Sequence, residues 1–437
     1  MKLTTLFTRS SALVLGIALV GISAAQSHPL APQLSSNPGA KYTIFLNFSG
    51  FNYSGTWAGA TPGNVPAYTL DGDATTFNAT EVNAIKQSWA RIAQAYVGFN
   101  INVTTVDPAS PTLTDAQRKT YYDQTQFMTH TVIGGTYNWY GASGGVSYLG
   151  IAQQATTSNG MRTNWVFPVN GSGTDPKGIA AAAIHEDGHH LRLPHQTDER
   201  TGAAYSDNNG ATGNGSYAPI MGTTYVSQRG TWRQGKAGTN VNDVAEIQQN
   251  TSIGSLLDSG KGHSIATATA LSVNPDGTIN SGAAKSWIMP KASTGYTAVG
   301  EDSYTKDYFS FNTNGGLVSL TANDGSSFLQ DGVADPGATM RCVLRILDIN
   351  GTVLGTSTED ITTLKHTWSG NLGAGTYYAQ IASYGAYTSS WEPDSRYFNM
   401  GGYFLSGSGF SAVPEPTSVL VLAGGVAVLL RRRRKSA

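Results

Sequence analysis

Residues 181–195 read AAAIHEDGHHLRLPH, and this stretch decides how the rest of the sequence is interpreted. The alanine run predicts a helix, which we expect to start at Asp175-Pro176 because aspartate is a favoured N-cap and proline a favoured first residue. His185 and His189 are four residues apart, so a helix would place both imidazoles on one face. The six-residue step to His195 lets the chain leave the helix and bend back. The stretch therefore predicts three converging histidines.

Three histidines would leave the fourth position of a tetrahedral zinc ion open to water, which is typical of catalytic rather than structural sites. Glu186 lies next to His185 in the sequence and can lean over the same site. A carboxylate in that place can take a proton from water and later deliver it to a leaving amine. We therefore expect Zn²⁺ as the cofactor, His185, His189 and His195 as its ligands, and Glu186 as the general base.

A methionine, Met221, follows in YAPIMG (residues 217–222). Together with the histidines it resembles the metzincin metalloproteases, whose signature is HExxHxxGxxH followed by a Met-turn. KYTIFLNFSGF (41–51), GGVSYLG (144–150) and NWVFPVNG (164–171) extend the resemblance over about residues 41–250. It implies an α+β metzincin-like catalytic domain, the same three zinc ligands and base, and Met221 as a hydrophobic floor below the metal.

The sequence departs from the metzincin pattern at two positions. Thr223 stands where some members have a tyrosine two residues after the methionine, and Tyr225 lies two residues further on. Arg192 stands at the signature glycine, where a left-handed backbone would cost a non-glycine residue roughly 1–2 kcal/mol. Two outcomes are open. Either Arg192 adopts the strained conformation, points to solvent and leaves His195 in place, or the turn re-forms and Pro194 stiffens a different exit. In the second case the third ligand becomes weaker or is replaced, with His190 or Asp198 as the candidates.

Two further features of this region carry predictions. The segment Gly145, Val146, Ser147 and Tyr148 resembles the edge strand that pairs with an extended peptide substrate in metzincins. The oxygen-rich stretch SDNNGATGNGS (206–216) makes Ca²⁺ a second candidate ion, although it lacks the regular acidic spacing of an EF-hand and is typical of a surface loop. Gly188 suggests close packing or the tight approach of another strand, and Asp187 is expected to be a solvated helix residue.

The region 41–260 is expected to form the catalytic domain. Its periodicity predicts helices at 79–97, capped by Asn78 or Thr80, and at 241–249. Strands are expected at 41–51, 101–107, 128–133, 145–151 and 164–167. After Gly260 the helical periodicity ends, and short strands alternate with glycine-rich turns.

Residues 261–411 predict an all-β sandwich. The segments at 307–311, 350–351, 375–378 and 402–403 resemble the bacterial pre-peptidase C-terminal domain, which commonly follows secreted proteases. We expect Cys342 to be a buried small hydrophobe, and the acids Asp302, Asp307 and Asp324 to be turn residues, with calcium binding as the alternative.

Both ends of the chain resemble processing signals. Residues 1–25 have the basic start, apolar run and small-residue end of a signal peptide, and 26–40 would form a flexible leader. Residues 412–437 combine VPEP, an apolar run and RRRRK, which resembles the PEP-CTERM sorting signal of Gram-negative bacteria. The resemblance implies a transient inner-membrane anchor, an exosortase-like cleavage partner and release to the cell envelope or the exterior.

Composition agrees with an extracellular, β-rich protein. Of 437 residues, 13% are charged and 52 are glycine, and the net charge of -1 gives no reason to expect nucleic acid binding. A single cysteine excludes an intramolecular disulfide. We expect a monomeric, secreted zinc endopeptidase acting on protein or peptide substrates. The competing hypothesis is a catalytically inactive, protease-like surface or matrix binding protein, against which the retained Glu186 argues.

Overall fold

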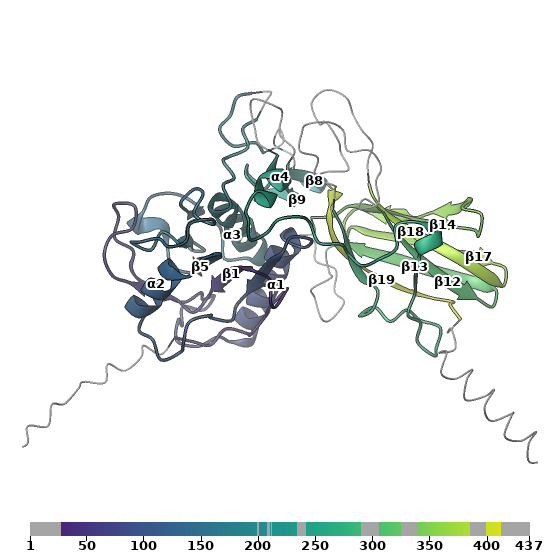
Figure 1. The fold of residues 1–437 in the computed structure, drawn as a ribbon, viewed down its shortest axis with the longest axis horizontal. Helices are drawn as coiled ribbons and strands as arrows, with labels where there is room; N and C mark the ends of the chain where they lie inside the picture. The colour runs from purple at the N-terminus through teal and green to yellow at the C-terminus, as the bar shows by residue number, and fades with distance from the viewer. Residues whose placement is uncertain are drawn as a thin grey trace, which may run out of the picture.

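The computed structural model describes residues 28–198, 201–207, 210, 212–233, 242–289, 306–324, 339–384 and 399–411. These residues form two lobes, a mixed α and β lobe followed by a lobe of strands (Figure 1). The expected signal peptide, the sorting tail and Asp302 lie outside the described residues. Within the described ranges, no helix has the length and apolar character needed to cross a membrane.

The first lobe is built on a five-stranded sheet with the order β4-β1-β5-β7-β6. Four strands run parallel, and β6 at the edge pairs antiparallel with β7. The elements of this lobe, in chain order, are β1 (Tyr42–Asn47), β2 (Phe51–Tyr53), β3 (Gly63–Val65), α1 (Ala79–Ala95), β4 (Ile101–Thr104), α2 (Asp115–Gln124), β5 (Met128–Ile133), η1 (Tyr137–Trp139), β6 (Gly145–Val146), β7 (Thr163–Val166), α3 (Pro176–His190), β8 (Gly213–Pro219), β9 (Ser227–Thr231) and α4 (Asp243–Gln248).

The two faces of this sheet are covered by different elements. Ile44 and Leu46 of β1 belong to the apolar core that also contains residues of α1 and α3. Phe45, between them, belongs to a second core with residues of β2 and α2 on the opposite face. Alternate strand residues point to opposite faces, so β1 contributes to both cores. The lobe is therefore three-layered, with α3 held firmly against the sheet.

The predicted helix at 79–97 is present as α1, and its start confirms Asn78 as the cap. The Asn78 side chain accepts hydrogen bonds from the Thr80 and Glu81 N–H groups, and Glu81 accepts one from the Asn78 N–H. This reciprocal capping box satisfies amide groups that have no partner inside the helix.

Three expectations for this lobe are corrected. The leader packs against the sheet in its described part: the Ser36 N–H donates to Val103 O at 3.0 Å, and Ala31 is buried in the core. An unpaired edge of β4 thus obtains hydrogen-bond partners from the leader. The strand expected at 145–151 covers only Gly145–Val146, and α2, β8 and β9 were not predicted. Gly213–Ser216, expected within a surface loop, belong to β8, which pairs with β9.

The second lobe is a sandwich of two five-stranded sheets, as predicted. Their orders are β10-β12-β18-β14-β15 and β11-β19-β13-β17-β16, and their inner faces enclose one apolar core. The elements are η2 (Ile265–Thr267), β10 (Thr269–Ala270), β11 (Lys285–Ile288), β12 (Lys306–Thr313), β13 (Gly316–Asp324), β14 (Cys342–Leu347), β15 (Val353–Thr356), β16 (Thr358–Asp360), β17 (Lys365–Leu372), β18 (Gly375–Ser383) and β19 (Gly401–Ser408).

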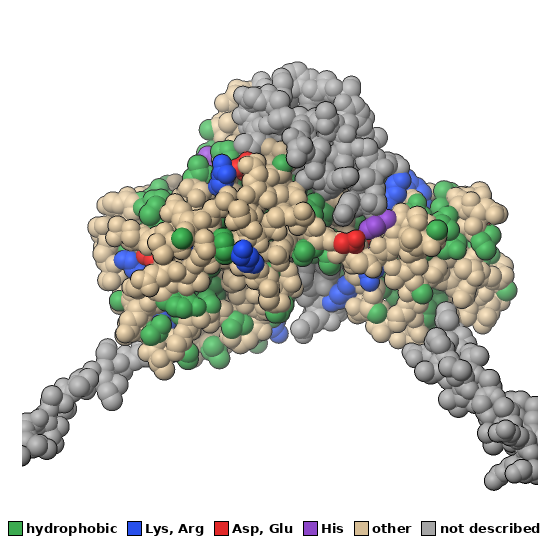
Figure 2. All heavy atoms as spheres, in the orientation of Figure 1, with side chains coloured by type: hydrophobic (Ala, Val, Ile, Leu, Met, Phe, Trp, Pro, Cys, Tyr) green, Lys and Arg blue, Asp and Glu red, His purple; other side chains and the backbone are tan. Residues whose placement is uncertain are grey.

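The two lobes pack against each other along α1 and β9. The Gln94 side chain donates to Gly402 O at 2.8 Å, and the buried Arg229 donates to Thr339 O at 3.0 Å. Met289 and Met400 of the second lobe belong to the apolar core of the first. On the face shown in Figure 2, charged side chains are few and scattered.

Candidate metal centre

Helix α3 begins where the sequence predicted and carries the first two histidines. The Asp175 side chain accepts from the Lys177 and Gly178 N–H groups, and Pro176 opens the helix. One side of the helix rests on the sheet. There Asp187 is fully buried and accepts hydrogen bonds from Thr131 at 2.6 Å and Asn164 at 2.9 Å. Asp187 is therefore not a solvated residue as expected, because it anchors α3 to β5 and β7. Burial raises its pKa to about 7.

The structure brings His185, His189 and His195 together. Each offers a ring nitrogen, and these nitrogens all lie within 4.8 Å of one another. Nε2 of His189 lies 3.1 Å from Nε2 of His195. All three side chains are partly exposed, so the cluster opens to solvent. His190 is buried instead and contacts Thr129 at 3.0 Å, and neither it nor Asp198 belongs to the cluster.

Backbone carbonyl groups set the tautomers of the two helix histidines. Nδ1 of His185 lies 2.8 Å from Ile220 O, and Nδ1 of His189 lies 2.7 Å from Leu193 O. A carbonyl oxygen only accepts, so each Nδ1 carries the hydrogen and each neutral ring keeps a bare Nε2 lone pair. Outer-shell contacts of this kind orient histidines that bind metals.

The same histidines are held in the neutral form. Burial, with His189 nearby, lowers the pKa of His185 to about 3, and burial lowers the pKa of His189 to about 4. Burial also lowers the pKa of His195. Neutral imidazoles with converging lone pairs are the donor set that Zn²⁺ prefers, so the residues present fit this ion.

Arg192 adopts the first of the two conformations considered above. Its φ is +80°, in the left-handed region, and the Leu193 N–H donates to Gly188 O at 3.0 Å. The side chain is 47% exposed, and its Nε lies 3.3 Å from Glu246 Oε1 of α4. Arg192 therefore forms the left-handed turn for which the signature has a glycine. This turn brings His195 back to His185 and His189.

Met221 packs against helix α3 at Gly188, which lies between His185 and His189 in the sequence. It is fully buried, and a Cβ added at Gly188 would lie 2.6 Å from its sulfur. This contact explains the glycine inside α3, as predicted from close packing. The residue before it, Ile220, holds His185 through its carbonyl group. The Met221 turn and the helix thus fit together only because position 188 lacks a side chain.

Glu186 lies between the histidines and the edge strand. Its side chain is 6% exposed, and burial, with Asp187 nearby, raises its pKa well above the usual value. A Cβ added at Gly145 would lie 2.9 Å from Glu186 Oε1. Strand β6 therefore passes directly beside the carboxylate. Tyr148 turns away into an aromatic cluster, where it contacts Trp57 at 4.8 Å between ring centroids, and Ser147 donates only to Tyr148 O.

Two tyrosines complete the surroundings of the cluster. The Tyr205 ring lies 4.2 Å from the His195 ring, centroid to centroid. A Cβ added at Gly144 would lie 2.0 Å from the Tyr225 hydroxyl, so this hydroxyl approaches the backbone next to β6. Burial and then Glu186 raise the pKa of both tyrosines, that of Tyr225 to about 12. Sequence reasoning set Tyr225 aside on its spacing, and no motif marked Tyr205.

The acids considered for calcium are not turn residues where they are described. Asp307 lies in β12, is buried, and accepts hydrogen bonds from Ser286 and Tyr403 at 2.5 and 2.6 Å. Both of these bonds go to Oδ2, and the Ser259 hydroxyl donates to Oδ1 at 3.2 Å, so protein donors contact both oxygens. Asp324, also buried, ends β13. The segment 206–216 is described only in part.

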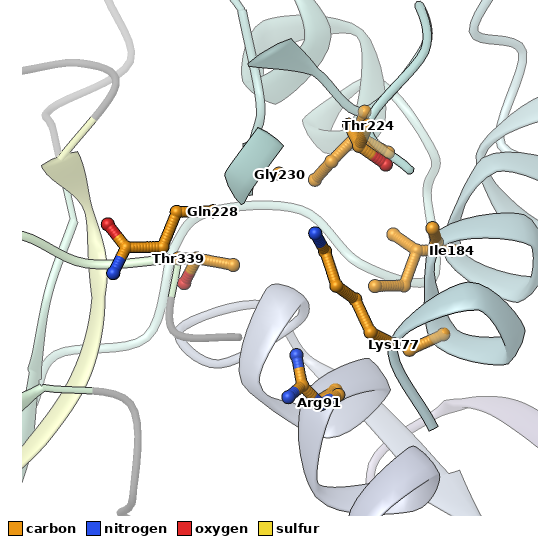
Figure 3. A pocket seen from close by; sticks show the side chains of 10 residues that line it. Arg91, Lys177, Ile184, Thr224, Gln228, Gly230 and Thr339 are labelled. Atoms are coloured by element: carbon orange, nitrogen blue, oxygen red, sulfur yellow. The ribbon is translucent and has the colours of Figure 1, made fainter. Parts of the chain in front are cut away.

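A separate pocket of about 30 Å³ lies at the junction of the lobes. Arg91 of α1 and Lys177 of α3 extend into it, and Gln228 and Thr339 close it from the other side (Figure 3). None of the candidate site residues lines this pocket.

The comparisons with known proteins do not test this site. No protein-family model matches the chain, and no curated protein matches it. Among solved structures, a pre-peptidase C-terminal domain of a collagenase from Bacillus anthracis is 13% identical, with a TM-score of 0.19, covering 32% of this chain and 93% of that one. A family 35 carbohydrate-binding module from Clostridium thermocellum is 14% identical, with a TM-score of 0.14, covering 28% and 96%. At these scores the likenesses carry no argument, and the sandwich rests on the strand pairing described above.

Proposed function

We propose that this chain is a secreted zinc endopeptidase. Its active site, in the first lobe, would hydrolyse the peptide bonds of protein or peptide substrates. One observation carries the proposal: three imidazole nitrogens converge, partly exposed, beside the buried carboxylate of Glu186 and the edge strand β6. His185, His189 and His195 would hold the zinc. A bound zinc ion would polarise a carbonyl group and bring the pKa of water to about 7.

The remaining chemistry falls to side chains of this chain. Glu186 takes a proton from the attacking water at its carboxylate oxygen and then donates it to the nitrogen of the leaving amine. Burial raises the pKa of Glu186, which favours the uptake of this proton from water. Met221 supports the histidines from below, without a contact to the substrate.

The edge strand supplies a binding surface for an extended substrate. Strand β6 pairs with β7 on one side only, since it ends the sheet order. A peptide that adds to the free side would extend the sheet through main-chain hydrogen bonds and pass beside Glu186. Gly145 and Val146 of β6 are proposed for this contact, together with Ser147 and Tyr148, which follow the strand; the Tyr148 ring also packs against Trp57.

The metzincin resemblance supports this proposal and also suggests where the protein acts. The proposed route is export by the signal at residues 1–25, transient anchoring by the PEP-CTERM segment at 412–437, and release to the envelope or exterior. No calcium ion is needed for the proposed reaction.

Casein cleavage by the zinc-loaded full chain tests the function. We expect hydrolysis that a chelator abolishes and that Glu186→Gln lowers by about 10²–10⁴-fold, the usual range for a lost general base. Glu246→Gln is the matched control, because Glu246 contacts Arg192 at the surface, and it should retain activity. A folded, zinc-loaded chain that cleaves no protein would favour the inactive binding protein, and equal activity of Glu186→Gln would overturn the mechanism.

A further inference from the structure

A second group of metal-type ligands lies in the sandwich, far from the histidines in sequence. Asp324 ends β13, Cys342 begins β14, and His366 lies in β17 opposite Ala322. Strands β13 and β17 belong to one sheet and β14 to the other. The three side chains therefore meet between the two sheets, where the strands end or begin.

The three side chains are close together and completely enclosed. Their ligand atoms all lie within 4.8 Å of one another, and each residue is at most 2% exposed. Cys342 Sγ lies 3.0 Å from Asp324 Oδ1, and His366 Nε2 lies 3.3 Å from Asp324 Oδ2. Among the described residues, this buried Nε2 has no hydrogen-bond partner of acceptable geometry. A buried ring nitrogen without such a bond is costly, and a bound cation would satisfy it.

We propose that Asp324, Cys342 and His366 form a closed binding site for Zn²⁺ or a similar thiophilic divalent cation. Zinc–ligand bonds of about 2.0–2.3 Å place the ligand atoms of a tetrahedral site about 3–4 Å apart. The Cys342–Asp324 and His366–Asp324 separations of 3.0 and 3.3 Å match this spacing, and all three ligand atoms lie within 4.8 Å of one another. A thiolate and an imidazole select zinc over calcium or magnesium, which prefer oxygen. Binding releases the Cys342 thiol proton, which burial and Asp324 otherwise retain by raising the pKa of the thiol.

Charged side chains surround the cluster of Asp324, Cys342 and His366, and they determine its hydrogen bonding when no cation is bound. Arg341 holds both oxygens of Glu359, at 2.6 and 2.5 Å, and Glu359 Oε1 lies 3.8 Å from His366 Nε2. Glu359 Oε1 is therefore a further oxygen close to the cluster. In the cation-free alternative the thiol keeps its proton and donates it to Asp324, and Asp324 balances the buried Arg229.

The position of the site suggests a structural role. A cation held by β13, β14 and β17 would cross-link the two sheets at one end of the sandwich. The same end contacts the first lobe, because Thr339, three residues before Cys342, accepts a hydrogen bond from Arg229 of β9. The cation would thus fix the sandwich at its junction with the first lobe.

Cobalt substitution tests this site without relying on peptidase activity. The full chain carrying His185→Ala and His189→Ala, which lacks the first site, is loaded with Co²⁺ under reducing conditions. We expect a thiolate-to-cobalt charge-transfer band in the near ultraviolet at one equivalent. Cys342 is the chain's one cysteine, so such a band can come from no other residue.

Variants then assign the ligands. Cys342→Ser should abolish the band, and His366→Gln should weaken Co²⁺ binding by at least tenfold, whereas His263→Gln, at another sandwich histidine, should leave both unchanged. A folded chain with saturating Co²⁺ and no band would overturn the proposal in favour of the cation-free cluster, even if the Cys342 variant fails to fold. Unchanged affinity in His366→Gln would also overturn it.

Discussion

The two clusters of metal-type side chains differ in how the chain builds them. His185, His189 and His195 come from one helix and the turn that follows it, and all three remain partly exposed. Asp324, Cys342 and His366 come from three strands of two sheets and are fully buried. The first cluster is partly open to solvent, whereas the second is enclosed by the sandwich core.

This difference separates the two functions that a metal site can have. A catalytic zinc ion needs a position that water and substrate can reach, whereas a structural one needs complete enclosure by protein. The helix provides two ligands at a fixed spacing and leaves one side free for substrate. In a sandwich of two packed sheets, the ligands of an enclosed ion come from segments that are far apart in the sequence. The predictions below test this contrast, beginning with the largest expected effect.

The largest effect concerns the third ligand of the open site. His195→Ala should weaken zinc binding at that site by more than the ~100-fold that loss of an outer-shell partner can cost. His190→Ala is the matched control, because His190 is buried beside Thr129 and belongs to neither cluster. Zinc titration by calorimetry measures both. Equal zinc affinity of His195→Ala and the unchanged protein would exclude His195 as a ligand.

The next effect concerns the floor of the open site. Gly188→Ala should destabilise the protein by roughly 1–3 kcal/mol through overpacking against the Met221 sulfur. Helix propensity alone predicts the opposite, a gain of about 1 kcal/mol. Urea unfolding decides between them. In the double variant with Met221→Ala, the cost of Gly188→Ala should largely disappear, because the clashing atom is gone.

Much of the open site could be predicted from the sequence because its determinants are local. The spacing of the histidines, the Asp175 cap and the Gly188 packing all lie within one helix and its ends. The burial of Asp187 was missed because the sequence does not show which side of α3 rests on the sheet. Tyr205 and Tyr225 were missed because a loop places them. The fold class of the sandwich followed from its alternating strands.

The closed cluster could not be predicted, for a different physical reason. Its three residues meet only through the register of β13 with β17 and the packing of β14 across the core. A shift of one residue in either strand would turn His366 or Asp324 to the other face. Cys342 was expected to be a small hydrophobe, and it does lie in the apolar core, but its sulfur also contacts Asp324.

A smaller effect measures the strain at Arg192. Arg192→Ala keeps the left-handed backbone and loses the Glu246 contact, whereas Arg192→Gly also removes the strain. Arg192→Gly should therefore be more stable than Arg192→Ala by about 1 kcal/mol, after the greater freedom of glycine in the unfolded chain is subtracted. Thermal unfolding of the two variants gives this difference. An Arg192→Gly variant that is less stable than Arg192→Ala would show that position 192 carries no strain.

The smallest effect is a pH dependence in the second lobe. The pKa of His263 is raised from 6.5 to about 9, mainly by its hydrogen bond to Asp307. Burial opposes this rise, and the Lys306 carbonyl group adds to it. The protonated form of His263 therefore stabilises the fold fully below pH 6.5, and this contribution is lost as the pH rises through 9. His263→Gln should remove that part of the stability loss between these pH values, measured by urea unfolding. An unchanged profile would mean that His263 does not keep its proton.

The central claim is that the open cluster binds zinc with three histidines and leaves one position for water. Anomalous diffraction at the zinc edge, on crystals of the zinc-loaded full chain, tests it most directly. The account predicts a peak within bonding distance of His185, His189 and His195, about 2.0–2.1 Å from each nitrogen, with a solvent oxygen as the fourth ligand. A peak with four protein ligands, or bound zinc with no peak at these histidines, would contradict it.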